Sequence, residues 1–262
     1  MLIALYTAVI FVATTLGAFV GLGGGVIIKP ILDFIGSEPR MQVDFLSCVA
    51  VFTMSVVTTG KYIAKKQKFN AGIIAFIAVG SVIGGWLGSA ATQLLGEYFR
   101  QELIRCVQAF TLAALLGGVS IYVGKCNFSY NVKNNAAIFL VGLALGFTAS
   151  FLGIGGGPIN VAVLTLFFSM NVKESAVYSV AIIFFSQLTK LITLFASDGI
   201  APYSHQWKTL LFILPAAVIG GLVGSKFNRK FDDKVIRKVF VAAMIVLVAL
   251  NLYNGATYLG TN

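Results

Sequence analysis

The pentapeptide Gly-Leu-Gly-Gly-Gly at residues 21–25 recurs as Gly-Ile-Gly-Gly-Gly at residues 153–157. Each copy interrupts an apolar stretch that is otherwise typical of a membrane helix. Four glycines in five residues do not sustain a helix, because glycine loses the most backbone freedom on ordering and leaves peptide groups uncovered. In lipid such groups are tolerated only where protein or a water-filled cavity surrounds them. The two pentapeptides therefore predict two broken helices and are the first place to look for function.

The composition is that of an integral membrane protein. The 262 residues are 58% hydrophobic and only 11% charged, and windows of roughly 20 apolar residues recur along the chain. We expect one all-α, polytopic membrane domain over residues 1–262. The first residues lack the basic region and cleavage site of a removable signal peptide, so we expect the first helix to be retained. The net charge of +10 fits basic cytoplasmic loops beside anionic lipid, and nucleic acid is not an expected partner.

The apolar pattern predicts eight membrane-embedded segments, four in each half. They cover residues 2–35, 42–63, 71–95, 103–124, 135–170, 175–197, 208–225 and 237–255. A second motif is shared by the two halves, because VIGGWLGS at residues 82–89 recurs as VIGGLVGS at residues 218–225. We therefore expect an internal duplication, with repeat 1 over about residues 1–124 and repeat 2 over about residues 135–262.

The basic residues indicate how the halves are oriented. They cluster after the second segment, at residues 61–68, and after the seventh, at residues 226–238. Short basic loops stay in the cytoplasm, yet these two loops would face opposite sides if all eight segments crossed completely. The conflict disappears if each glycine-broken segment enters and returns on one side, which makes the repeats inverted and places both termini outside. The arm before each pentapeptide is nevertheless about 27–30 Å long as a helix, enough to cross alone, so a parallel arrangement stays open.

The broken helices predict an anion site. New helices are expected over residues 26–35 and 158–170, and Pro158 suits the first helical position. A helix N-terminus offers free N–H groups and partial positive charge, and glycine-rich backbone lets an anion approach closely. Two such ends near the membrane midplane are typical of secondary transporters. The alternative is close helix packing, which we favour for the glycines within residues 82–89 and 218–225.

Lys190 lies inside the apolar segment 175–197, where a charge is costly unless it faces a cavity or a partner. Ser186 lies one turn earlier on the same helical face. Snorkelling to the outer surface is the alternative for Lys190, and Lys29 either adds charge near the outer entrance or is solvated. The candidate substrate-binding residues are Gly21, Gly23, Gly24, Gly25, Gly153, Gly155, Gly156, Gly157, Pro158, Asn160, Ser186, Gln187 and Lys190.

Other polar residues give weaker indications. Asp44 and Glu174 are expected in the first turns of helices, where a carboxylate complements the helix dipole, and proton coupling is the alternative. Cys48, Cys106 and Cys126 have neither metal-ligand nor redox spacing, so we interpret them as small core residues. The sequence contains no recognisable acid–base pair, metal cluster or catalytic triad. We therefore expect no enzyme activity, no metal and no cofactor.

Together, the two pentapeptides, the apolar segments and the basic loops resemble the sulfite exporter TauE/SafE family of membrane permeases over essentially the whole chain. The resemblance implies transport of a small sulfur anion, such as sulfite, thiosulfate or sulfoacetate, across the bacterial inner membrane. Export is expected, because an anion leaving a negative interior gains about 2.3 kcal/mol per 100 mV.

Several alternatives to a sulfur-anion exporter stay open: an importer or channel for a small anion, and a thiol-relay membrane protein. The expected partners are the small anionic substrate and membrane lipids, and the oligomeric state is open between a monomer and a homodimer. The first copy has Val26 where the second has Pro158, so the two hairpins are expected to contribute unequally.

Overall fold

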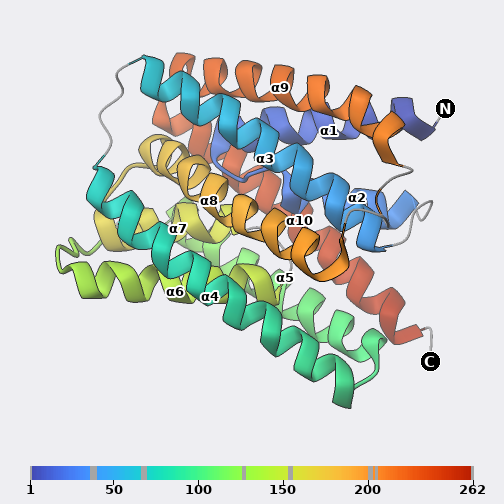
Figure 1. Cartoon of the computed structure of the whole chain (residues 1–262). Helices are drawn as coiled ribbons and strands as arrows, with labels where there is room; N and C mark the ends of the chain where they lie inside the picture. The colour runs from blue at the N-terminus through green and yellow to red at the C-terminus, as the bar shows by residue number, and fades with distance from the viewer. Residues whose placement is uncertain are drawn as a thin grey trace.

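A computed structural model describes residues 2–35, 40–65, 70–125, 128–152, 156–199, 203 and 206–260. Within these ranges the chain forms ten helices and no β-strand, as the all-α prediction requires. The helices are α1 (Leu2–Val20), α2 (Gly25–Ile35), α3 (Arg40–Ala64), α4 (Ala71–Tyr98), α5 (Gln101–Lys125), α6 (Asn135–Phe151), α7 (Gly157–Phe168), α8 (Val172–Asp198), α9 (Trp207–Lys230) and α10 (Asp233–Gly260) (Figure 1).

Seven of these helices are long and apolar enough to cross a membrane, namely α1, α3, α4, α5, α8, α9 and α10. The shorter helices α2, α6 and α7 come from the two glycine-broken segments. Large apolar side chains are exposed on the outside of the bundle, such as Leu211 at 72% and Ile121 at 63%, and such a surface suits contact with lipid. The prediction of a multi-pass membrane protein is confirmed. The count of eight segments stays a prediction.

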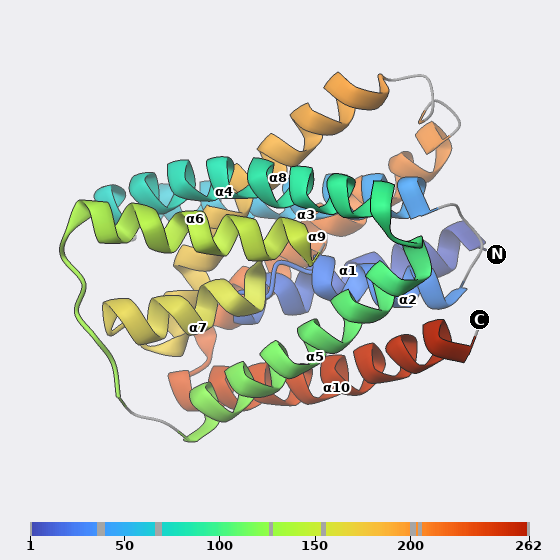
Figure 2. The ribbon, with the colours of Figure 1, turned by 90° about the horizontal axis from the view of Figure 1, so that it is seen from below.

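The first break has the form that its glycines predict. Gly21, Gly23 and Gly24 have φ angles of 81°, 78° and 73°, in the left-handed region that glycine adopts without strain. The chain reverses there, and α2 runs back along α1 toward the end of the molecule at which α1 begins (Figure 2).

The second break has the same outline. Gly156 has a φ of 78° and caps α7, with Pro158 in the first turn, whereas Gly153 and Gly155 lie outside the described residues. The segment before α6 pairs with the end of α7, because the N–H groups of Tyr130 and Val132 donate to carbonyls in the last turn of α7 at 2.6 and 2.9 Å. This segment too enters and returns at one end of the protein.

Two tight helix pairs each combine one helix from each half. In the pair α4–α6, a Cβ atom at Gly84 or Gly88 would overlap backbone atoms of α6. In the pair α1–α9, a Cβ atom at Gly220 or Gly224 would overlap atoms of α1. Both pairs run parallel, and their glycines let the backbones touch. The packing interpretation of these glycines is confirmed.

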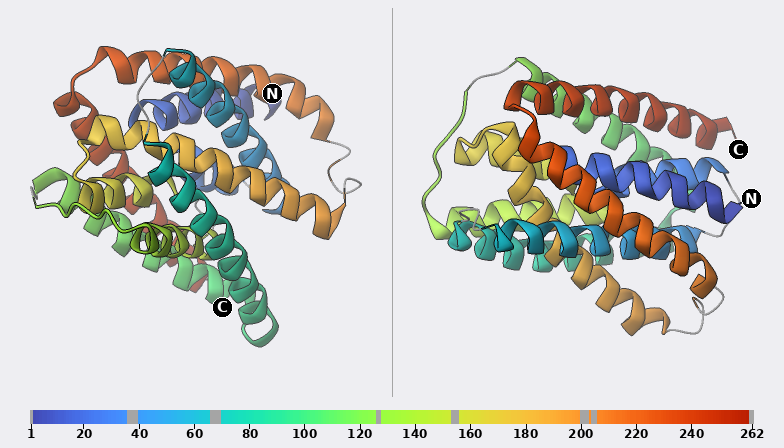
Figure 3. Two further views of the ribbon diagram at one scale, coloured as in Figure 1. Left: turned by 60° about the vertical axis from the view of Figure 1, so that its left-hand side comes forward. Right: turned by 90° about the horizontal axis from the view of Figure 1, so that it is seen from above.

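Helices that correspond in the two repeats, α3 with α8 and α5 with α10, meet in antiparallel pairs. Between α3 and α8, Phe45 contacts Phe195 and Phe52 stacks on Phe184, with ring centroids 6.0 and 5.5 Å apart. Between α5 and α10, the Cys106 thiol lies 3.8 Å from the carbonyl of Gly255, and the other ends of these two helices also meet. The two halves are thus intertwined around α3, α7 and α8 (Figure 3).

The described basic clusters lie at one end of the molecule. The Lys61 ammonium donates to the carbonyl of Leu222 at 2.8 Å, and the Lys173 ammonium donates to the carbonyls of Arg229 and Phe231 at 3.2 and 2.9 Å. The end of α3, the start of α8 and the end of α9 therefore meet, although they are far apart in sequence. The start of α1 and the end of α10 lie at the opposite end (Figures 1 and 2).

Candidate substrate-binding site

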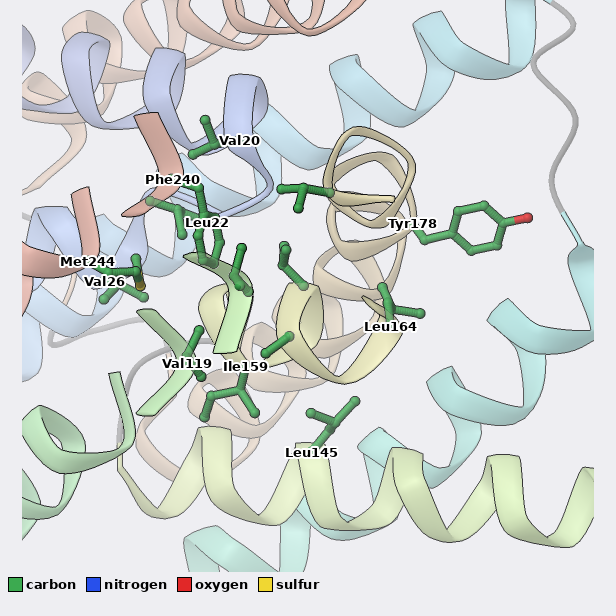
Figure 4. Close-up of a cluster of buried hydrophobic side chains, with 14 of the residues drawn as sticks. Val20, Leu22, Val26, Val119, Leu145, Ile159, Leu164, Tyr178, Phe240 and Met244 are labelled. Carbon is green, nitrogen blue, oxygen red and sulfur yellow. The ribbon is translucent and has the colours of Figure 1, made fainter. Parts of the chain in front are cut away.

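The two glycine breaks meet at the centre of the protein. A Cβ atom at Gly157 would overlap the backbone of Leu22, and Leu22 lies beside α7 within the central apolar cluster (Figure 4). Ser179 of α8 joins the two breaks, since its hydroxyl donates to the carbonyl of Gly21 at 2.7 Å and lies 3.3 Å from the carbonyl of Gly157. The pentapeptides thus form one buried junction, braced by α8.

Close packing surrounds the first break. A Cβ atom at Gly21 would lie 2.5 Å from the Cα of Ala176, and one at Gly23 would lie 2.6 Å from the side chain of Ile183. The N–H of Gly25 donates to the carbonyl of Gly23 at 2.9 Å, so one donor of the new helix is already used. These glycines have a packing role in the fold, and an additional role in binding an anion stays a prediction.

A cavity of about 260 Å³ lies between α4, α6 and α8, in the half of the protein away from the basic end. The short helix α6 ends there, and the C-terminal halves of α4 and α8 diverge beyond it (Figures 1 and 2). Hydroxyl and amide groups line much of the wall. The polar lining residues are Ser81, Ser89, Gln93, Ser150, Ser186, Gln187, Thr189, Lys190 and Thr193.

Lys190 provides the positive charge of this cavity. No carboxylate among the described residues lies within ion-pair distance of its ammonium group. Ser186 lies one turn away on the same wall and donates to the carbonyl of Ile182 at 3.2 Å, so its hydroxyl must rotate before it can donate to a ligand. Gln187 is 4% exposed and also lines the cavity.

The junction and the cavity are neighbours. Ala149 lines the cavity and would lie 3.2 Å from a Cβ atom at Gly156. Asn160 is 3% exposed, and its amide lies close to the same glycine. Of the predicted site residues, Ser186, Gln187 and Lys190 line the cavity. Gly156 and Asn160 lie just behind its wall, and the first pentapeptide lies deeper, at the junction.

Sequence reasoning missed the contribution of α4 and α6 to this wall. Ser81, Ser89 and Ser150 are serines within apolar segments, and serine is common enough at helix–helix contacts that the pattern alone does not single them out. The available signal was that Ser89 ends the repeated motif at residues 82–89. The role of Ser179 in joining the breaks was also missed, because it depends on a contact between distant segments.

The interpretation of Asp44 and Lys29 requires correction. The helix α3 begins at Arg40, two residues earlier than the expected residue 42, so Asp44 lies beyond its first turn. Asp44 instead forms an ion pair with Lys29 of α2, and the two side chains are 26% and 15% exposed. Lys29 is therefore neither a solvated lysine nor a free charge. Glu174 does lie in the first turn of α8, as expected.

The cysteines with described positions are buried. Cys48 is 2% exposed and Cys106 is 6% exposed, and each lies near a different helix, α8 and α10 respectively. The core interpretation holds for both. Cys126 lies outside the described residues.

Comparison with known proteins decides the family. The sequence profile described as "Sulfite exporter TauE/SafE" matches residues 6–252. The chain belongs to the sulfite exporter TauE/SafE family. It is therefore a membrane transporter of that family, as the sequence resemblance predicted.

Curated relatives of this TauE/SafE chain carry a general name. The probable membrane transporter protein YunE of Bacillus subtilis is 28% identical, over 93% of this chain and 95% of its own length. A probable membrane transporter protein of Haemophilus influenzae is 25% identical, over 97% of this chain and 95% of its own length. No solved structure gives a significant match.

Proposed function

We propose that the chain is a secondary transporter that exports a small sulfur-containing anion across the bacterial inner membrane. The substrate class is sulfite, thiosulfate or an organosulfonate such as sulfoacetate, and the cavity between α4, α6 and α8 is its binding site. The observation that carries the proposal is Lys190, a lysine without an ion-pair partner among the described residues, in a polar cavity of a TauE/SafE protein.

The chemistry of the cavity supports an anion. A lysine within a membrane helix is costly, and it is retained where it faces a cavity or a charge of opposite sign. Serine hydroxyls, such as that of Ser89, can donate to an oxyanion. The volume of about 260 Å³ lies below the range of about 300–1,000 Å³ that is typical of sites for drug-sized ligands, and it suits a small oxyanion.

We also propose that the two repeats are inverted. The antiparallel pairing of α3 with α8 and of α5 with α10 supports this relation, as does the return of each broken segment to the end from which it enters. Inverted repeats that meet at discontinuous helices are a known design of secondary transporters, in which one part of the protein moves against the other.

Ligand-dependent thermal stabilisation of the purified protein tests the proposed site. The panel is sulfite, thiosulfate, sulfate, sulfoacetate, taurine and chloride. A ligand at 100 times its dissociation constant adds about 2.7 kcal/mol to the free energy of unfolding. We expect one sulfur anion to stabilise the protein and Lys190→Ala to weaken its binding by roughly 10- to 100-fold, the value of a hydrogen bond to a charged group.

The control for the Lys190 experiment is Lys125→Ala, which removes an exposed lysine from the last turn of α5. This variant should bind the anion like the native protein. If no sulfur anion stabilises the protein, or if Lys190→Ala binds it normally, the proposed site is wrong.

An importer or a channel for the same anion is the remaining candidate, because the residues that line the cavity do not determine the direction of transport. Flux into vesicles separates these functions. A carrier shows counterflow of labelled anion, whereas a channel does not. Export further predicts that flux follows an inside-negative potential without a coupled ion.

A further inference from the structure

The two tight helix pairs, α4–α6 and α1–α9, are counterparts in the duplicated sequence, and internally they pack alike. Gly84 and Gly88 of α4 lie against α6, and the corresponding Gly220 and Gly224 of α9 lie against α1. In each of the four positions a Cβ atom would overlap the partner helix. Each pair therefore behaves as one rigid arm, held together by direct backbone contact.

The two arms differ in how they meet the central helices. The face of α9 that carries Gly221 is packed on α3, since a Cβ atom at Gly221 would lie 3.0 Å from the hydroxyl of Thr58 and 3.2 Å from Met54. At the corresponding Gly85 of α4, no atom of α8 lies within 4 Å of the position that a Cβ atom would take. Among the described residues, a Cβ atom there would contact only Ser150 and Gly146 of α6, the partner of α4 in the same arm. Gly85 instead lines the cavity.

Lys61 closes the packed face. Its ammonium donates to the carbonyl of Leu222 at 2.8 Å and to the hydroxyl of Ser225 at 2.9 Å, both on α9. The residues of α4 that correspond to this acceptor pair are Trp86 and Ser89, and both line the open cavity opposite α8, which carries Lys190. The α1–α9 arm is thus held to the central helix α3 by Lys61. The α4–α6 arm stands apart from Lys190 on the central helix α8, which corresponds to α3 in the second repeat.

Each arm also has a hydrogen bond to a central helix near its start. The N–H of Asn70, just before α4, donates to the hydroxyl of Tyr178 of α8 at 2.7 Å. The amide of Gln206, just before α9, donates to the buried amide of Gln42 of α3 at 2.6 Å. These attachments lie at opposite ends of the molecule, and each is the point about which its arm would swing once the contacts of its far half are released.

We propose that the protein alternates between two conformations and that the structure is one of them. In this conformation the α1–α9 arm is packed on α3, and the α4–α6 arm is separated from α8 by the cavity. Lys61 is the residue that holds the closed arm. In the second state the α4–α6 arm closes on α8, with Lys190 donating to acceptors of α4, while α9 leaves α3 and opens a path at the basic end. This inference rests on the proposed transport function, because alternating movement of the two arms is useful only if a substrate crosses the membrane.

Thiol accessibility in membrane vesicles tests the exchange. Two reporters are placed singly in a background without Cys48, Cys106 and Cys126: Ser89→Cys in the open cavity, and Met54→Cys at the closed α3–α9 face, where Met54 is fully buried. A membrane-impermeant maleimide is applied to each side. We expect Ser89→Cys to react from the side opposite the basic end, and Met54→Cys to react at least about tenfold more slowly from the basic side.

Adding Lys61→Ala should then change both rates in opposite directions. Loss of the Lys61 contacts favours the second state by about tenfold or more, so the Met54→Cys reporter reacts faster and the Ser89→Cys reporter more slowly. Lys61→Arg keeps a donor at this position and should change both rates less. Lys125→Ala removes a lysine at the same end without touching α9 and should change neither.

Three outcomes would overturn the exchange of arms: equal reactivity of the two reporters before Lys61 is changed, no response to Lys61→Ala, or a rise of both rates together. A joint rise indicates general loosening, and the thermal unfolding midpoint of each variant checks this directly. Anion-dependent stabilisation is measured on the same samples. If an anion binds but the reporters do not exchange, only the arms are wrong; if no anion binds, the proposed function fails by itself.

Discussion

Lys190 and Lys61 are both lysines on apolar helices, but their ammonium groups have different surroundings. Lys61 donates to two oxygen atoms of α9, whereas Lys190 lines a cavity without an ion-pair partner among the described residues. The same side chain therefore has two distinct uses in this fold. Only the first could be exchanged for another hydrogen-bond donor without changing the charge offered to a ligand.

Gly157 is the position where a single methyl group should do the most damage. A Cβ atom there would overlap the carbonyl of Leu22, which is backbone and has little room to shift. We expect Gly157→Ala to lower the free energy of unfolding by about 3 kcal/mol or more, because overpacking at this point separates the two breaks. Thermal unfolding in one detergent, at one scan rate, measures the effect.

Gly117→Ala is the matched control for Gly157→Ala. Gly117 lies inside α5, and nothing lies within 4 Å of the position its Cβ atom would take. Replacement of a helical glycine by alanine without a clash stabilises by up to about 1 kcal/mol. If both variants unfold at the same temperature, contact between the two breaks does not limit stability.

At the scale of the helix, two adjacent glycines of α4 have different surroundings: Gly84 packs against the backbone of α6, and Gly85 lines the cavity. Gly84→Ala would push a Cβ atom into the carbonyl of Leu143 and force α4 away from α6, whereas Gly85→Ala would meet the Ser150 hydroxyl at 3.1 Å, which can rotate away. We expect a loss of about 2–3 kcal/mol for Gly84→Ala and less than about 1 kcal/mol for Gly85→Ala. Equal losses in thermal unfolding would contradict the parallel α4–α6 contact.

The helices themselves were largely predictable, because their signals are local. The pentapeptides ended α1 at Val20, and the positions after them began α2 and α7 close to the expected residues. The pairing of α4 with α6 and of α1 with α9 was not predictable, since small residues mark a close contact without naming the partner. For the same reason Lys190 and Ser186 could be placed on one face, while the opposite wall with Ser89 could not.

At the scale of the whole molecule, the described basic clusters share one end, which should be cytoplasmic. Ser129→Cys, in the segment between α5 and α6, and Lys208→Cys, in the first turn of α9, lie at opposite ends. In a background without native cysteines, an impermeant maleimide should label Lys208→Cys in intact cells and Ser129→Cys only in inside-out vesicles. Labelling of both from one side would contradict the orientation.

The pairing of α1 with α9 has a consequence for how the protein is made. Translation proceeds at about 5–20 residues per second, so the ribosome needs roughly 10–40 s after completing α1 before it completes α9. Throughout that interval α1 is in the membrane without the neighbour that covers it, whereas α4 and α6 emerge close together. The first helix to be synthesised is thus among the last to reach its final packing, and insertion factors or lipid must accommodate its small-residue face until then.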